Sequence, residues 1–161
     1  MRKLVFYPDK CTGCAICTMA CVISHANGNV LDFRASRIRV INNKQKIIQV
    51  VSVCYQCEEA YCISTCPTGA LLRDESLGFI RVNKDLCISC GSCVEACPYK
   101  GVILSSTDVK PIICDLCGGD PVCVKWCPFD AIRYIDVDEK SLPEIKKLRQ
   151  QVVDLLRKAL E

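Results

Sequence analysis

Residues 54–98 decide the fold of this chain, and they read CYQCEEAYCISTCPTGALLRDESLGFIRVNKDLCISCGSCVEACP. The stretch contains two runs of four cysteines, and each run ends in a Cys-Pro pair. The later run has the spacing C-x2-C-x2-C-x3-C-P, whereas the earlier one has two additional residues in its middle gap. Between the runs, the apolar segments GALLR and FIRVN flank the polar segment DESLG, which predicts a short β-hairpin.

The spacing of the later run is that of bacterial ferredoxins with two clusters, in which the fourth cysteine of each run ligates the cluster of the other run. We therefore predict that the two runs form one unit with two 4Fe-4S clusters. The predicted ligands are Cys54, Cys57, Cys62 and Cys97 for one cluster (the Cys54 set), and Cys87, Cys90, Cys93 and Cys66 for the other (the Cys87 set).

Two further runs complete the sixteen cysteines, so that runs one to four begin at residues 11, 54, 87 and 114. Run one has Val22 in place of the proline, and run four has a widened middle gap. Crossed ligation predicts two outer sets: Cys11, Cys14, Cys17 and Cys127 (the Cys11 set), and Cys114, Cys117, Cys123 and Cys21 (the Cys114 set). Pairing of run one with run two and of run three with run four stays open, although a predicted hairpin between runs one and two disfavours it.

The composition indicates that bound metal supplies much of the cohesion. The 161 residues have an apolar fraction of 50% that already counts the cysteines, which leaves a thin core for two subdomains. Disulfides are disfavoured because residues 1–11 lack the apolar segment and cleavage site of an export signal, so we expect a cytoplasmic chain. Zinc sites use paired C-x2-C hooks around one ion, whereas C-x2-C-x2-C suits the corners of a cluster.

Charge and hydropathy exclude two classes of partner. The formal charge is +3, but each 4Fe-4S core with its four thiolates adds about −2, which brings the loaded chain to about −5. We therefore expect no nucleic-acid partner. No apolar run approaches the length of a transmembrane helix, so we expect no membrane span.

The apolar patterns place the remaining elements around the cysteine runs. They predict a strand over residues 2–10, a helix from run one to Gly28 that the missing proline permits, and a hairpin of residues 36–41 and 46–53 around NNK. An apolar strand follows each Cys-Pro pair, and a single strand with a turn is expected before run four. Residues 141–161 predict an amphipathic helix with Ser141 as N-cap, which packs either on this subunit or on a partner chain.

The predicted fold class is α+β. It comprises two ferredoxin-like subdomains of the bacterial 2[4Fe-4S] type with a pseudo-two-fold relation, an inserted β-hairpin and a C-terminal helix. The predicted outer unit contains residues 1–28 and 105–138, the hairpin residues 29–53, the inner unit residues 54–104, and the amphipathic helix residues 139–161.

Other candidate residues receive structural interpretations. His25 is the only histidine, and we expect it at a helix end or on the surface. The aromatic residues beside the cysteines, which are Tyr55, Tyr61, Tyr99 and Trp126, are expected to exclude water from the clusters. The glycines of CGGDP lack the spacing of a phosphate-binding loop, so we predict no nucleotide site.

Four such runs in this order resemble the four-cluster iron-sulfur subunits of molybdenum and tungsten pterin oxidoreductases. The segments KCTGCAICTMACVISHANG, SRIRV and CYQCEEAYCISTCPTGA resemble most the short electron-transfer subunits of the aldehyde:ferredoxin oxidoreductase family, including the benzoyl-CoA reductase relatives. The resemblance covers residues 5–135 and implies two ferredoxin-like halves with the nested ligation given above.

The resemblance implies a subunit without catalytic residues of its own in a hetero-oligomer of anaerobic metabolism. It would relay single electrons through four 4Fe-4S clusters, between a larger tungsten- or molybdenum-pterin subunit and a ferredoxin or another redox subunit. All-cysteine ligation agrees with this role because it leaves no open iron position for a substrate. A free-standing polyferredoxin carrier is the alternative, and a structural zinc protein is a third hypothesis.

Overall fold

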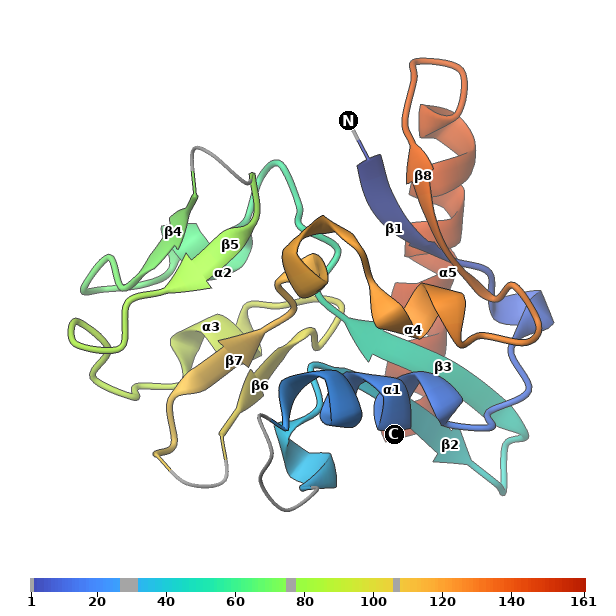
Figure 1. Cartoon of the computed structure of the whole chain (residues 1–161), viewed down its shortest axis with the longest axis horizontal. Coiled ribbons are helices and arrows are strands. Elements are labelled where there is room, and N and C mark those ends of the chain that lie inside the picture. Colours follow the sequence, from blue (N-terminus) through green and yellow to red (C-terminus); the bar gives the residue numbers. More distant parts are fainter. Residues whose placement is uncertain (1, 27–31, 75–77, 106–107) are drawn as a thin grey trace.

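The computed structural model describes residues 2–26, 32–74, 78–105 and 108–161, and it shows a small α+β molecule with two halves (Figure 1). Within these residues the strands form four antiparallel two-stranded sheets. The elements are β1 (Arg2–Phe6), α1 (Ile16–His25), β2 (Ile38–Asn43), β3 (Ile48–Val53), α2 (Tyr61–Ser64), β4 (Leu71–Arg73), β5 (Ile80–Val82), α3 (Ser92–Glu95), β6 (Val102–Leu104), β7 (Pro111–Ile113), α4 (Val122–Lys125), β8 (Ile132–Asp136) and α5 (Leu142–Leu160). Short 3-10 helices lie at Pro8–Lys10, Phe33–Ala35 and Leu116–Gly119.

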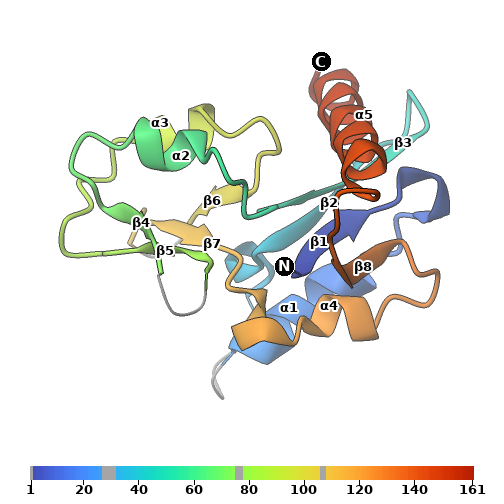
Figure 2. The same cartoon turned by 90° about the horizontal axis from the view of Figure 1, so that it is seen from above.

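The outer half is formed by the two ends of the cysteine-bearing chain. Strand β1 pairs with β8, with Leu4 opposite Tyr134 and Phe6 opposite Ile132. Helix α1 packs against α4, as Figure 2 also shows. Run one therefore lies beside run four, although more than half of the chain separates them in sequence.

The inner half contains α2, α3 and two hairpins. Strand β4 pairs with β5, as the sequence predicts, and α2 packs against α3. Strand β6 pairs with β7, so the segment before run four is a complete hairpin and not a single strand with a turn. The boundary predicted between residues 104 and 105 falls between the two strands of this hairpin, and β7 also contacts β5.

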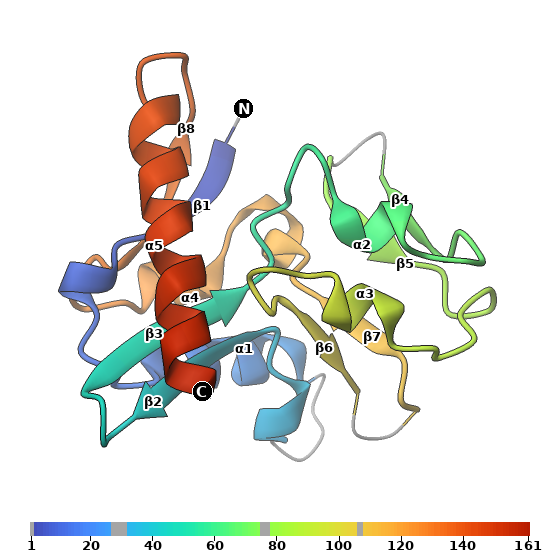
Figure 3. The ribbon, with the colours of Figure 1, turned by 180° about the vertical axis from the view of Figure 1, so that it is seen from behind.

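The hairpin of β2 and β3 joins the two halves and supplies much of the apolar core. Val50, Val51 and Val53 of β3 are buried, because this strand is covered on both sides. Figure 3 shows α5 crossing β2 and β3, and α5 also contacts β1. The C-terminal helix thus packs on this subunit's own sheets, which decides between the two surfaces that the sequence left open.

Several boundaries differ from the predicted ones for local reasons. The turn of the β2–β3 hairpin occupies residues 44–47, and Ile47, predicted in the strand, is exposed with a left-handed backbone (φ 54°). Asn43 ends β2, and its side-chain oxygen accepts a hydrogen bond of 3.0 Å from the Lys46 amide. Ser141 precedes α5, but its side chain bonds Asp138 and not the helix amides. The predicted helix stop at Gly28 lies outside the described residues.

The buried face of α5 provides a test of its role in stability. We expect Leu156→Ala to lower the stability of the loaded protein by about 2–5 kcal/mol, because Leu156 is 2% exposed and its removal leaves a cavity between the helix and the sheet. Leu160→Ala is the matched control, since Leu160 is 58% exposed and its loss should cost less than about 0.5 kcal/mol. The measurement is the denaturant midpoint under anaerobic conditions, and equal midpoints would contradict the packing described here.

Candidate metal centres

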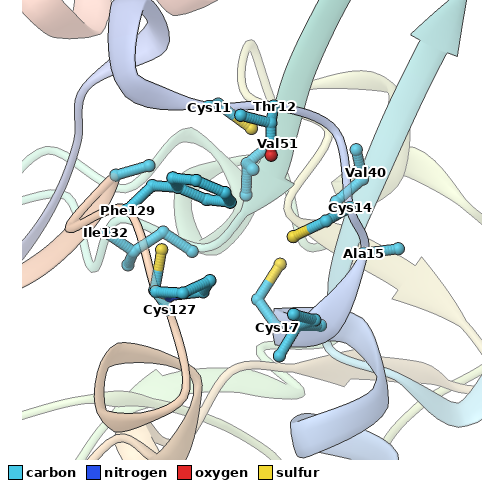
Figure 4. Close-up of a pocket in the computed structure, with 13 residues that line it drawn as sticks. Cys11, Thr12, Cys14, Ala15, Cys17, Val40, Val51, Cys127, Phe129 and Ile132 are labelled. Carbon is cyan, nitrogen blue, oxygen red and sulfur yellow. The ribbon is translucent and has the colours of Figure 1, made fainter.

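The first cavity lies between run one and the end of run four. Its lining includes all four members of the Cys11 set together with Phe129 and Ile132, and it encloses about 320 Å³ of empty space that opens partly to solvent. Figure 4 shows the sulfur atoms of these cysteines directed toward a common space. Three thiols come from the loop that begins α1, whereas Cys127 comes from the turn before β8.

Two further cavities have almost the same size and composition. The members of the Cys54 set line about 320 Å³ of empty space, and those of the Cys87 set line about 340 Å³. In each cavity, three cysteines come from one run and the fourth from the partner run. The apolar and aromatic lining of the cavity at the Cys54 set includes Tyr55, Tyr61 and Tyr99, which the sequence assigned to water exclusion.

The members of the Cys114 set come from run four and from α1. Helix α1, which carries Cys21, packs against α4, which carries Cys123, and Ser24 of α1 donates a hydrogen bond of 3.9 Å to the Cys117 sulfur. Burial raises the pKa of Cys123, and the nearby charges of Cys114, Cys117 and Cys21 raise it further. The structure therefore places three predicted groups around common cavities, and it packs run four against the helix that carries the remaining member of the fourth group.

A shared backbone conformation folds each run around its cavity. The residue before the second cysteine is left-handed in all four runs: Gly13 (φ 71°), Gln56 (φ 50°), Ser89 (φ 57°) and Leu116 (φ 55°). This turn reverses the chain so that the second thiol faces the first. Only one of the four residues is a glycine, although a side chain in this conformation costs about 1–2 kcal/mol.

The proline after the fourth cysteine limits the length of the helix that precedes it. In runs two, three and four the third residue after that cysteine is left-handed, at Gly69 (φ 63°), Lys100 (φ 49°) and Asp130 (φ 53°), so the chain turns into the next strand. Run one has Val22 instead of proline, and its helix α1 continues for ten residues, whereas α2, α3 and α4 have four residues each. The predicted effect of the missing proline is thus found in the described part of α1.

Backbone amides point at the fourth cysteine of two runs. The Gly101 amide donates to the Cys97 sulfur at 3.3 Å, and the Arg37 amide donates to the Cys21 sulfur at 3.3 Å. Gly101 is required by close packing, because a Cβ atom there would lie 2.4 Å from the carbonyl carbon of Val53. Because Gly101 has no Cβ atom, the chain after Cys97 can approach the chain before Cys54, and the thiols of Cys97 and Cys54 reach one cavity.

The buried side chain of Gln56 connects run two with run four. Its amide nitrogen donates to the Cys114 carbonyl at 2.6 Å, and its amide oxygen accepts from the Ile80 amide at 2.7 Å. Burial raises the pKa of Cys54, and the nearby charge of Cys114 raises it further. The Cys54 and Cys114 sets are thus adjacent at the centre of the molecule.

His25 is the last residue of α1, where the sequence placed it, and it joins run one to run four. Its Nδ1 lies 2.7 Å from the Cys21 carbonyl, and its Nε2 lies 3.2 Å from the Asp115 carboxylate. Arg37 donates to the other oxygen of Asp115 at 2.8 Å. Burial alone would raise the pKa of Asp115, but the Arg37 guanidinium lowers it below its usual range. Asp115 therefore stays ionised and holds the Arg37 guanidinium and the His25 ring beside the Cys114 set.

The sequence analysis missed two residues of these sites, Gln56 and Arg149. Arg149 lies on α5 and donates a hydrogen bond of 3.2 Å to the Tyr55 carbonyl, behind the wall of the cavity at the Cys54 set. Its spacing from Ile145 and Val152 puts it on the buried face of the helix, which is a signal that the sequence contains. No local pattern shows that Gln56 reaches run four.

The donor chemistry fits iron-sulfur clusters. All sixteen cysteines lie within the described residues, and none of them forms a disulfide. In three cavities, three thiols come from one run and the fourth from the partner run. Such all-thiolate donor sets are those of 4Fe-4S clusters.

Comparison with known families agrees with this donor chemistry. A family model described as a 4Fe-4S dicluster domain matches residues 45–137, and one described as a 4Fe-4S binding domain matches residues 8–21. The chain belongs to the 4Fe-4S dicluster family. The predicted ferredoxin-like character is thereby confirmed, and sixteen cysteines supply the ligands of four 4Fe-4S clusters.

Individual relatives cover nearly the whole chain. It is 36% identical over 160 residues to the aliphatic sulfonate oxidoreductase polyferredoxin-like subunit of Pyrococcus furiosus, with 96% of this chain and 91% of that protein covered. It is 38% identical over 162 residues to the putative electron transport protein YsaA of Escherichia coli, with 94% and 99% covered. Among solved structures, the active site complex BamBC of benzoyl coenzyme A reductase with benzoyl-CoA contains a chain with the same fold (TM-score 0.50, 24% identity, 93% of this chain and 89% of that chain).

None of the helices in residues 2–26, 32–74, 78–105 and 108–161 combines the length and apolar character needed to cross a membrane.

The bridging role of Gln56 between runs two and four can be tested by mutation. We expect Gln56→Leu to lower stability by about 1–3 kcal/mol for each orphaned group, because it leaves the Cys114 carbonyl and the Ile80 amide buried without a partner. Gln49→Leu on the exposed side of β3 is the control. The readout is the anaerobic denaturant midpoint of the loaded protein, and a midpoint equal to that of the control would refute the bridging role.

Proposed function

We propose that this chain is an electron-transfer subunit without catalytic residues of its own, and that its four 4Fe-4S clusters are ligated by the Cys11, Cys54, Cys87 and Cys114 sets. The observation that carries the proposal is the convergence of three cysteines from one run and one from its partner on each of three similar cavities. The pairing of β1 with β8 supports the nested arrangement of runs over the alternative pairing. We also infer that the outer and inner units are related by a pseudo-two-fold axis, because each packs two cysteine-bearing helices together.

The arrangement of the sets supports a relay. Two contacts support the order of the sets: Gln56 of run two bonds the Cys114 carbonyl, and α1, which carries Cys17 of the Cys11 set, packs against α4, which carries Cys123. The four sets then form a row with the Cys87 set at one end and the Cys11 set at the other. A bound 4Fe-4S cluster exchanges one electron at a time, and such a row is the path that the chain would provide for single electrons.

Both ends of this row reach the surface. Cys90 of the Cys87 set and Cys14 of the Cys11 set are exposed, whereas Cys54 and Cys114 are buried. An exposed apolar side chain lines the cavity at each end, Ile88 (64% exposed) and Phe129 (47% exposed). Two accessible ends suit a chain that receives electrons from one protein and delivers them to another.

The partners that we propose are a larger tungsten- or molybdenum-pterin oxidoreductase subunit at one end and a ferredoxin or another redox subunit at the other, in a cytoplasmic hetero-oligomer. The support is the description of the Pyrococcus furiosus relative as an oxidoreductase subunit, together with the fold shared with a chain of an active site complex. The sixteen free thiols suit a reducing compartment.

A free-standing polyferredoxin carrier is the second candidate function, favoured by the accessible cysteines at both ends. Deletion of α5 would not separate the two candidates, because that helix packs on the chain's own sheets. Isolation of the native assembly does separate them. We expect the chain to co-purify anaerobically with a larger subunit that contains tungsten or molybdenum by metal analysis. Recovery of the chain alone, loaded with iron, would favour the free carrier.

The crossed ligation gives a second expected outcome. Cys93→Ala should remove the cluster of the Cys87 set and leave that of the Cys54 set, whereas Cys97→Ala should do the reverse. Each variant should retain about twelve of about sixteen irons, and electron paramagnetic resonance should show that different clusters are lost. Loss of the same cluster in both variants would show that the fourth cysteines do not cross between runs two and three.

A further inference from the structure

One charged residue lies on the buried face of α5. Ile145, Val152 and Leu156 of this helix are buried against the sheets, and Arg149 lies four residues after Ile145 and three before Val152. Residues at these spacings share one face of a helix. Arginine is almost never found inside a protein without a partner, so its position on this face requires an explanation.

The guanidinium of Arg149 is held against the wall of the cavity at the Cys54 set. Its Nη2 donates to the Tyr55 carbonyl at 3.2 Å, and its Cζ lies 5.4 Å from the centre of the Tyr55 ring. Tyr55 is 2% exposed, lines this cavity, and packs on Tyr99 with ring centres 4.8 Å apart. One aromatic layer thus lies between the cation and the cavity, and no ordinary bulk water screens the charge along this path.

The charge of Arg149 is not neutralised locally. Within the described residues, it forms no ion pair with a carboxylate, and its buried Nε has no hydrogen-bond partner. The loop between Cys57 and Cys62 contains two exposed carboxylates, Glu58 and Glu59, and Glu58 is bound by Lys3. Burial raises the pKa of Tyr55, so that the phenol stays neutral.

At two other cysteine sets, a nearby cation is paired with a carboxylate. Arg37 beside the Cys114 set forms an ion pair with Asp115, and Lys84 near the start of run three forms one with Asp108. At the Cys54 set, a further cation, Arg73, donates to the Cys57 carbonyl. The Cys54 set therefore has a surplus of positive charge that these two other sets lack.

We propose that Arg149 raises the reduction potential of the cluster in the Cys54 set. The inference rests on the ligation proposed above. A one-electron reduction changes the charge of a 4Fe-4S core with its thiolates from about −2 to about −3. A nearby cation across an apolar wall stabilises the more negative state, because charges interact more strongly in a medium of low dielectric constant.

A raised potential at the Cys54 set affects where an electron rests inside the relay. The Cys54 set lies between the exposed Cys87 set and the buried Cys114 set, so a higher potential there favours this position for a single electron. The residue responsible belongs to the C-terminal helix, which also covers β2 and β3. Arg149 is thus a tuning residue that acts through space and ligates nothing.

The test is a redox titration of the loaded protein with dithionite as electron donor, followed by electron paramagnetic resonance. We expect Arg149→Gln to lower the midpoint potential of one cluster by about 59 mV, which corresponds to a tenfold change in its one-electron equilibrium constant. That cluster should be the one missing from Cys62→Ala, and the other three should not shift. Arg149→Lys should keep most of the potential, and Lys147→Gln, on an exposed position of the same helix, should change nothing.

A second neutral variant covers the case in which Arg149→Gln does not retain iron. Arg149→Met removes the charge but keeps a long side chain against the Tyr55 ring, and it should lower the potential of the same cluster. Unchanged potentials in Arg149→Gln, or in Arg149→Met where the former does not load, would overturn the inference, as would an equal shift of all four clusters. Absence of four clusters from the unaltered protein would instead refute the proposed function itself.

Discussion

The structure depends on bringing thiols from distant parts of the chain to common points. Cys127 meets Cys11, Cys14 and Cys17 because β1 pairs with β8, and the two ends of the cysteine-bearing chain close into one half. The apolar core is thin for a chain of 161 residues, so covalent metal-thiolate bonds must contribute cohesion that packing alone does not give. Folding and metal binding are therefore two aspects of one process in this family.

The same constraint explains the strain in the cysteine loops. Gln56, Ser89 and Leu116 adopt the left-handed conformation that glycine adopts at the equivalent position of run one. Such strained residues persist where the surroundings over-determine the backbone. Here the requirement that four thiols face one cavity determines the backbone, because a relaxed loop would turn the second thiol away from the other three.

The elements outside the cysteine runs join the two halves and control their environment. The β2–β3 hairpin leads directly into Cys54, and Gly101 lets the chain after Cys97 pack against it. Helix α5 covers this hairpin and carries a cation to the wall of the neighbouring cavity. Gln56 connects run two with run four by hydrogen bonds, and Asp115 connects run four with the end of α1. A relay needs its centres at fixed distances and in stable electrostatic surroundings, and these contacts provide both.

The sequence by itself determined the family, the number of clusters and the hairpin after Cys66, because cysteine spacing and alternating apolar residues are local patterns read within one segment. It also predicted the four groups of cysteines, three of which the structure places around common cavities, since crossed ligation follows from spacing. Only the tertiary structure decided that Pro111–Ile113 is a strand, that α5 packs on its own sheets, and that Gln56 and Arg149 reach the sites. These features depend on which surfaces meet when the chain closes, and a contact between distant segments leaves no periodic signal in either of them.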